Sequence, residues 1–250
     1  MPIPLIYNDW LIASQPAPKA PTRLFCFPFA GGTFQVFRDW HKELPDTLEV
    51  IAVELPGRGR RFREPLFTQI APLVEALSIA IEPYLDRPFF FFGHSLGGLV
   101  SFELTRLLRR KLQVLPEVLF ISARRAPTLT KPRAISHLSD PEFIEEISQF
   151  NGTPSAILES DEFSQIFLPI LRADFSILDN YVYAEESPLD CPIITFGGQT
   201  DREVSRDDLG SWNIQTTSNH ELHMLPGDHF FINSSKAMLL AKISQYLQRA

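Results

Sequence analysis

Short runs of hydrophobic residues recur along the chain, separated by longer stretches in which apolar residues follow a helical period. Most runs lack alternation of apolar and polar residues, so we expect strands that are covered on both faces. They lie at Arg23–Phe27, Leu48–Val53, Phe89–Phe92, Val118–Ser122, Pro192–Phe196 and Glu221–Leu225. Helical patterns lie between them at Phe67–Tyr84, Leu96–Leu112 and Ser234–Arg249. This succession predicts an α/β fold with a mostly parallel, doubly wound sheet.

One segment, about 127–185, interrupts the alternation. It contains no strand-like run, and two helical patterns, Pro141–Phe150 and Glu162–Tyr181, take its place. We interpret the segment as a helical lid inserted into a single domain that spans residues 1–250; an extra packing layer without a gating role is the alternative. The second pattern has a broad apolar face. Three of its residues are expected to line a pocket beneath the lid: Phe167, Ile170 and Phe175.

Length and composition narrow the class of protein. A chain of 250 residues can bury one large core, and its net charge of -7 gives no general attraction for nucleic acid or anionic lipid. Cys26 and Cys191 have no metal-binding spacing and lie in or beside apolar runs, so we expect buried thiols in a reducing compartment. Neither a secretory signal nor an apolar stretch of about 20 residues is visible. We expect a soluble cytoplasmic protein.

Residues 89–98, FFFFGHSLGG, carry the most informative motif. A G-x-S-x-G sequence alone is a weak signal, but here it follows an apolar run and precedes a helical pattern, the context of a nucleophilic serine. Gly93 and Gly97 leave room for a tight turn that presents the Ser95 hydroxyl at the carboxyl end of the sheet, near a helix N-terminus. An ordinary loop serine between glycines is the alternative.

A serine nucleophile needs a base, and the base needs a carboxylate partner. His229 follows the last expected strand and therefore reaches the same edge of the sheet as Ser95. Asp201 ends the segment ITFGGQTD, also at a strand end, and we assign it as the partner of His229. Asp228 is the competitor, but the side chains of adjacent residues diverge. The chain order Ser95, Asp201, His229 is that of an α/β-hydrolase.

An oxyanion hole requires two hydrogen-bond donors. The backbone N–H of Leu96, directly after the serine, is the first candidate. The second is the N–H of Ala30 in the loop 27–33, where glycines allow the backbone to approach a tetrahedral oxygen. An ordinary turn is the alternative for this loop. No metal or cofactor is expected.

Taken together, these motifs resemble the type II (external, editing) thioesterases that accompany nonribosomal peptide and polyketide synthases. The matching segments are FCFPFAGG at 25–32, ELPGRGRR at 54–61, FFGHSLGG at 91–98, SARRAP at 122–127, GTP at 152–154, FLPILRADFSILDNYVY at 167–183, ITFGGQTD at 194–201 and LPGDHFFI at 225–232. The resemblance implies hydrolysis of acyl or aminoacyl groups from the phosphopantetheine thiol of a carrier protein or carrier domain, including removal of aberrant acyl groups.

The resemblance also assigns site residues. Ser95, Asp201 and His229 match the family's triad, and Ala30 and Leu96 match its oxyanion donors. A further position departs from the usual pattern: Phe29 stands where many members have histidine or tyrosine, and we expect it at the rim of the substrate pocket.

Two other functions stay open: a chain-terminating thioesterase for medium-chain acyl carriers, and a non-catalytic carrier-binding scaffold. Basic residues cluster at 58–63 and 106–111. Carrier domains are typically acidic, so the first cluster is the better docking candidate, whereas a solvated helix face is the simpler interpretation of the second. We expect a monomer.

Overall fold

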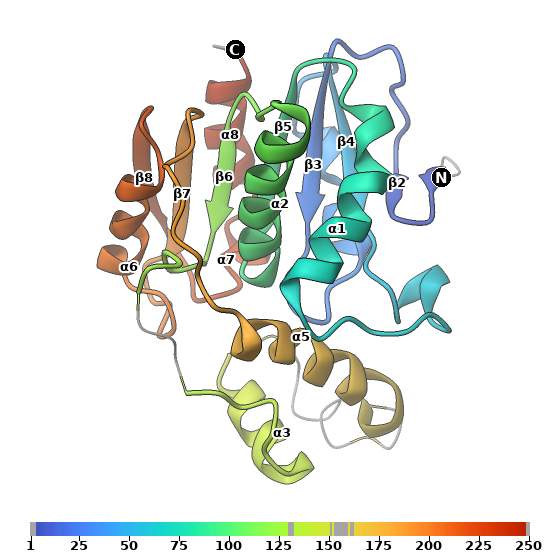
Figure 1. The fold of residues 1–250 in the computed structure, drawn as a ribbon, viewed down its shortest axis with the longest axis vertical. Coiled ribbons are helices and arrows are strands. Elements are labelled where there is room, and N and C mark those ends of the chain that lie inside the picture. Colours follow the sequence, from blue (N-terminus) through green and yellow to red (C-terminus); the bar gives the residue numbers. More distant parts are fainter. Residues whose placement is uncertain (1–3, 130–132, 151, 153–159, 161–162, 249–250) are drawn as a thin grey trace.

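Eight strands form one mixed sheet in a computed structural model that describes residues 4–129, 133–150, 152, 160 and 163–248. The strands are β1 (Leu5–Asn8), β2 (Leu11–Ala13), β3 (Thr22–Phe27), β4 (Leu48–Val53), β5 (Phe89–His94), β6 (Leu119–Ser122), β7 (Ile193–Gly198) and β8 (His220–Leu225). Their order across the sheet is β1-β2-β4-β3-β5-β6-β7-β8. Strands β3 to β8 are parallel, so their carboxyl ends share the lower edge of the sheet in Figure 1.

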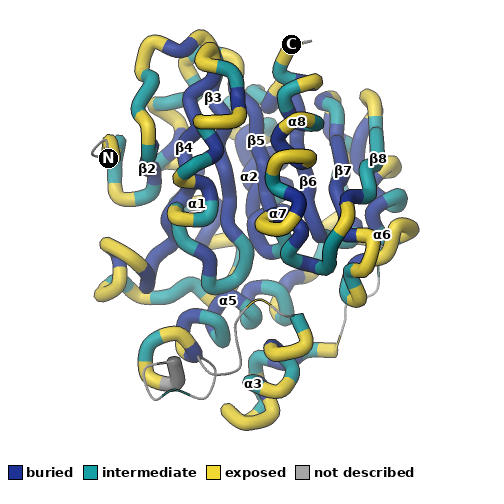
Figure 2. Tube along the Cα trace, turned by 180° about the vertical axis from the view of Figure 1, so that it is seen from behind, coloured by how far each residue is buried: buried dark blue, intermediate teal, exposed yellow. Residues whose placement is uncertain are grey.

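Helices cover both faces of this sheet. The first face carries α1 (Ile70–Ile81) and α2 (Leu96–Leu112). On the second face lie α7 (Phe231–Ser234) and α8 (Lys236–Leu247), which Figure 2 shows from behind. The short helix α6 (Arg206–Gly210) lies beside the β7–β8 side of the sheet. Tight 3₁₀ turns occur at Phe34–Phe37, Trp40–Lys42, Gly59–Arg61, Glu82–Tyr84 and Ser211–Gln215. The α/β-hydrolase architecture predicted from the sequence is confirmed.

The run of phenylalanines in β5 explains why the sheet has no polar face. Phe89 and Phe91 pack in the core beneath α1 and α2, whereas Phe90 and Phe92 pack in the core on the α8 side. Successive side chains of a strand point to opposite faces, so a strand covered twice needs apolar residues at every position. Helix α2 follows β5 directly and crosses the first face.

The N-terminal strands differ from the expected pattern. Two short strands, β1 and β2, precede the first strand expected from the sequence and extend the sheet antiparallel to β4. Leu11 pairs with Val53 and Ile12 with Ala52. A three-residue strand is too short to carry a detectable period, which is why the sequence pattern missed it.

Below the carboxyl edge of the sheet lie α3 (Asp140–Ser148) and α5 (Leu168–Asn180), both from the 127–185 insertion. Helix α3 begins with a reciprocal cap, in which the Glu142 carboxylate accepts hydrogen bonds from the N–H and hydroxyl of Ser139. A π-helical turn, Phe163–Phe167, precedes α5. The expected start at Glu162, the end at Arg249 and most of the linker 151–160 lie outside the described residues.

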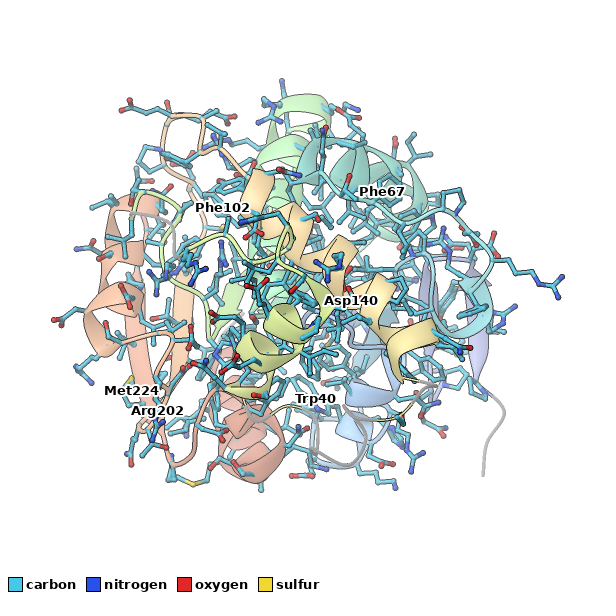
Figure 3. All side chains as sticks on the ribbon, turned by 90° about the horizontal axis from the view of Figure 1, so that it is seen from below. Trp40, Phe67, Phe102, Asp140, Arg202 and Met224 are labelled. Carbon is cyan, nitrogen blue, oxygen red and sulfur yellow. The ribbon has the colours of Figure 1, made fainter. Side chains whose placement is uncertain are left out.

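Seen from below, α3 crosses in front of the sheet edge, with Asp140 near the centre of the view (Figure 3).

Both cysteines are buried and unpaired with each other. No helix in the described part of the chain is long and apolar enough to cross a membrane.

Candidate active site

Ser95 sits in a strained turn between β5 and α2. Its φ of 53° and ψ of -111° are unusual for a residue with a side chain, a strain on the order of 1–3 kcal/mol that is typical of functional sites. Glycines make the turn possible, since a Cβ on Gly93 would lie 2.1 Å from the carbonyl oxygen of Gly97. A Cβ on Gly97 would lie 2.1 Å from that of Phe27, so the start of α2 and the loop after β3 are in close contact.

Three predicted side chains form one hydrogen-bonded row. His229 Nε2 lies 3.1 Å from Ser95 Oγ, and His229 Nδ1 lies 2.9 Å from Asp201 Oδ2. The His229 side chain is 6 % exposed and that of Asp201 fully buried. Because all three follow the carboxyl ends of parallel strands, β5, β7 and β8 bring them to one edge although they are far apart in sequence. This arrangement can remove a proton from the serine hydroxyl.

The two candidate carboxylates have different surroundings. Asp201 Oδ1 accepts hydrogen bonds from the backbone N–H groups of Glu203 at 2.8 Å and Val204 at 3.2 Å, which fixes the orientation of the carboxylate. Asp228 Oδ1 instead accepts from the N–H of Phe230 at 2.9 Å, within its own turn. Asp201 is therefore the carboxylate that reaches His229.

The ring of His94 is hydrogen-bonded to the backbone of His229. It is fully buried, and its ring nitrogens lie 2.8 Å from Ser122 Oγ and 2.9 Å from the carbonyl oxygen of His229. A carbonyl oxygen only accepts, so His94 Nε2 carries the proton and Nδ1 accepts from the serine hydroxyl. Burial, with a smaller contribution from nearby His229, holds the pKa of His94 well below its usual range. The ring stays neutral and fixes the backbone of His229.

This lowered pKa makes stability depend on pH. In the unfolded chain His94 takes up a proton as the pH falls through about 6.5, whereas the folded protein keeps it neutral. The free energy of unfolding is therefore expected to fall with decreasing pH below about 6.5, by at most about 1.4 kcal/mol per pH unit from this residue. His94→Gln, which retains a donor for the His229 carbonyl, should show a shallower decline between pH 6.5 and 5 in urea titrations. Parallel curves for the variant and the wild type would contradict this role.

The predicted oxyanion donors lie on either side of Ser95. Leu96 starts α2, where backbone N–H groups have no partner within the helix. Ala30 lies in the loop after β3 and, like Ser95, lines the cavity described below. Neither amide has a hydrogen-bond acceptor among the described residues. Both are thus free to donate to a substrate oxygen.

A buried ion pair holds the loop that contains Ala30. Arg58 and Asp174 of α5, with side chains 3 % and 2 % exposed, form two hydrogen bonds of 2.7 Å each. Asp174 Oδ2 also accepts from the N–H of Gly31 at 2.7 Å. Gly31 has a φ of +75°, the left-handed conformation that suits glycine. Helix α5 is therefore hydrogen-bonded directly to the loop that contains Ala30 and Gly31.

This ion pair limits which residues of the cluster 58–63 can serve the predicted docking, which stays a prediction. Arg58 is buried against Asp174, and Arg61 is buried against Glu64, so neither presents a free charge at the surface. Only Arg60 and Arg63 of the cluster are exposed. In the second cluster, at 106–111, the basic residues pair mainly with Glu186, Glu103 and Glu75.

A cavity of about 380 Å³ opens beside Ser95 and His229, between the sheet edge and the insertion. Phe29 and Phe175 line it, as predicted, whereas Phe167 and Ile170 are not among the described residues that do. Phe167 is 44 % exposed, and Ile170 is buried on the side of α5 that carries Asp174. Four residues of α5 line the cavity: Leu171, Phe175 and Leu178, at helical spacing, and Asp179.

Other parts of the site had no prediction from the sequence. Phe150, from the turn after α3, lies edge-on to His229 with ring centroids 5.6 Å apart, and Phe230 packs edge-on against Phe29 at 5.0 Å. No local pattern marks these contacts. Asp174, by contrast, is a charged residue within the apolar pattern 167–178, and that exception could have indicated a buried partner.

Similarity to known proteins extends over nearly the whole chain. Residues 22–247 match the family model of a thioesterase domain. The linear gramicidin dehydrogenase LgrE of Brevibacillus parabrevis is 43% identical over 96% of this chain and 93% of its own, and the gramicidin S biosynthesis protein GrsT of Aneurinibacillus migulanus is 40% identical over 96% and 94%. Among solved structures, the RedJ thioesterase from the prodiginine pathway of Streptomyces coelicolor superposes with a TM-score of 0.86 at 38% identity, covering 91% of each chain.

Proposed function

Because the chain belongs to the thioesterase family of α/β-hydrolases, we propose that it hydrolyses acyl or aminoacyl groups from the phosphopantetheine thiol of carrier proteins, as the editing enzyme of a nonribosomal peptide or polyketide synthase. The relatives named for gramicidin and prodiginine biosynthesis support this setting. The observation that carries the proposal is the row Ser95–His229–Asp201 at the edge of a largely apolar cavity.

The reaction begins with attack of Ser95 Oγ on the thioester carbonyl while His229 Nε2 takes up the hydroxyl proton. Asp201 holds the imidazole in the required tautomer and stabilises its charged form. The negative charge that develops on the carbonyl oxygen accepts hydrogen bonds from the Ala30 and Leu96 amides. The carbon–sulfur bond then breaks, and the pantetheine thiol leaves with the proton from His229.

The second half of the cycle releases the acyl group. Water attacks the acyl-serine ester while His229 again accepts a proton, which it returns to Ser95 as the ester bond breaks. A thioester carbonyl is activated, and a thiol leaves with little need for protonation. Hydrolysis of the Ser95 ester is therefore the harder step, and it depends on the same three side chains.

The test uses the purified protein and carrier proteins loaded through their phosphopantetheine arm. Acetyl, aminoacyl and decanoyl carriers are compared, with release of the free carrier thiol measured by intact-protein mass spectrometry. Hydrolysis of acetyl and aminoacyl carriers at rates comparable with or above that of the decanoyl carrier supports editing. No hydrolysis of any loaded carrier would contradict the proposal.

A chain-terminating thioesterase for medium-chain acyl groups is the second candidate, because apolar side chains form most of the cavity wall. Strong preference for the decanoyl carrier would favour it. A non-catalytic scaffold would not label with a fluorophosphonate probe. The name of the Brevibacillus relative points to a reaction of another class, but the hydrogen-bonded row at Ser95 supports acyl transfer. The monomeric state stays a prediction.

A further inference from the structure

Arg124 occupies an unusual place in the cavity beside Ser95. It follows β6 and Ala123, whose φ of 49° is a strained conformation for a residue other than glycine. Trp212 Nε1 donates to the Arg124 carbonyl oxygen at 2.7 Å and fixes the backbone there. The Arg124 Cβ lies 3.1 Å from the position of a Cβ on Gly98. Gly98 lies one turn of α2 after Ser95, because its N–H bonds to the Ser95 carbonyl. The Arg124 side chain, which starts beside Gly98, is therefore about one helical turn from the serine.

The charge of Arg124 has no counter-ion in the described part of the chain. Its Nε atom is buried and has no hydrogen-bond partner among the described residues. The neighbouring Arg125 differs, because its guanidinium donates to the Glu203 carbonyl at 2.6 Å and lies 3.9 Å from the Asp208 carboxylate. Burial, together with repulsion from Arg125, lowers the pKa of Arg124 to about 10, so the residue is charged at neutral pH.

Asp179 and Glu146, two of the three acidic residues of the cavity wall, have other partners. Asp179 Oδ2 accepts hydrogen bonds from the backbone N–H groups of Ile135 and Ser136 at 3.0 and 2.8 Å. Glu146 lies 3.6 Å from Arg133. A buried Nε–H without an acceptor is unfavourable for the empty protein. Such a group is compensated when a ligand supplies the acceptor.

We propose that Arg124 is a specificity residue that binds an oxygen atom carried by the acyl group, a ketone carbonyl or a carboxylate near the thioester, once that group enters the cavity. This inference rests on the proposed function, because it concerns the acyl group that Ser95 receives. The donors of Arg124 match an acceptor oxygen a few bonds from the reacting carbonyl. A purely alkyl chain contacts the apolar wall equally well but leaves Arg124 without an acceptor.

Three thioesters of the same carrier separate these cases, because their acyl groups share one branched skeleton. Acetoacetyl carries a neutral β-carbonyl, malonyl a carboxylate, and 3-methylbutyryl methyl groups in place of both oxygens. The measured quantity is kcat/KM for each, in the wild type, in Arg124→Met and in the matched control Arg125→Met. Comparing ratios between proteins removes the intrinsic reactivity of each thioester.

In Arg124→Met, kcat/KM for an oxygen-bearing acyl group, divided by that for 3-methylbutyryl, is expected to fall about 10-fold or more, the effect of losing one charged hydrogen bond. Arg125→Met should leave this ratio unchanged. A fall for acetoacetyl identifies a carbonyl ligand, and a fall for malonyl alone identifies a carboxylate. Unchanged ratios for both would overturn the proposal while leaving the thioesterase function intact; failure of the wild type on every loaded carrier would instead contradict the function itself.

Thermal unfolding provides a second measurement. Because the buried Nε of Arg124 has no hydrogen-bond partner among the described residues, Arg124→Met is expected to keep or raise Tm. A fall of several degrees, together with an equal loss of activity on all three thioesters, would assign Arg124 a structural role and overturn the proposal.

Discussion

Replacing Ser95 with alanine is expected to lower the turnover of carrier thioesters by about 10⁶-fold, the loss seen when a triad loses its nucleophile. The remaining side chains cannot form an acyl-enzyme, so only slow background hydrolysis is left. Alanine fits the turn, since Gly93 and Gly97 provide the space there, and among the described residues the Ser95 hydroxyl bonds only to His229. The measurement is single-turnover release of the acyl group from a loaded carrier.

Two observations make this experiment decisive. Circular dichroism of Ser95→Ala should match that of the wild type and Tm should change little, because the substitution removes the hydrogen bond to His229 and leaves the turn otherwise intact. A fluorophosphonate probe should label the wild type at Ser95 and leave the variant unlabelled. Near wild-type hydrolysis by the folded variant would show that another residue is the nucleophile.

Asp201→Asn is expected to reduce turnover by about 10⁴-fold, since an asparagine at this position can hold the imidazole in the wrong tautomer. The amide NH₂ in place of Oδ2 cannot accept the hydrogen bond from His229 Nδ1. Asp228→Asn should lose far less activity, because its Oδ1 accepts from a backbone amide, a bond that asparagine can reproduce. The measurement is kcat for the two variants on the same loaded carrier.

The pair of variants is internally controlled. Both replace one carboxylate by an amide of the same size, so a general effect of losing one negative charge would appear in both variants, whereas Asp201 is the one hydrogen-bonded to His229. Greater damage from Asp228→Asn would mean that the carboxylate has been misassigned.

Local sequence signals predicted the parts of the site that depend on short stretches of chain. The strand, the glycines and the helix around Ser95 are contiguous, and α2 has the predicted bounds Leu96–Leu112. His229 and Asp201 could be placed because the carboxyl ends of parallel strands share an edge. The ion pair between Arg58 and Asp174 could not be predicted from a local pattern, because it joins residues 116 positions apart.

Phe167 and Ile170 are absent from the described cavity lining for two local reasons. Phe167 belongs to a π-helical turn, Phe163–Phe167, that precedes α5. Ile170 and Phe175 lie five positions apart in α5, about 140° around the helix axis, so their side chains point to different sides of the helix.

The hydrogen bond between Asp174 and the Gly31 amide couples the position of α5 to the geometry of the loop that contains Ala30. If α5 moved away from the sheet, Asp174 would leave both Arg58 and the Gly31 amide, and the neighbouring Ala30 amide would lose its fixed position. An enzyme opened in this way could admit a substrate but could not stabilise its oxyanion. Among the described residues, α3 has no such bond to the loop, and it packs on α5 through the small apolar cluster around Phe143. A displacement of α3 alone would therefore leave the hydrogen bond between Asp174 and Gly31 in place.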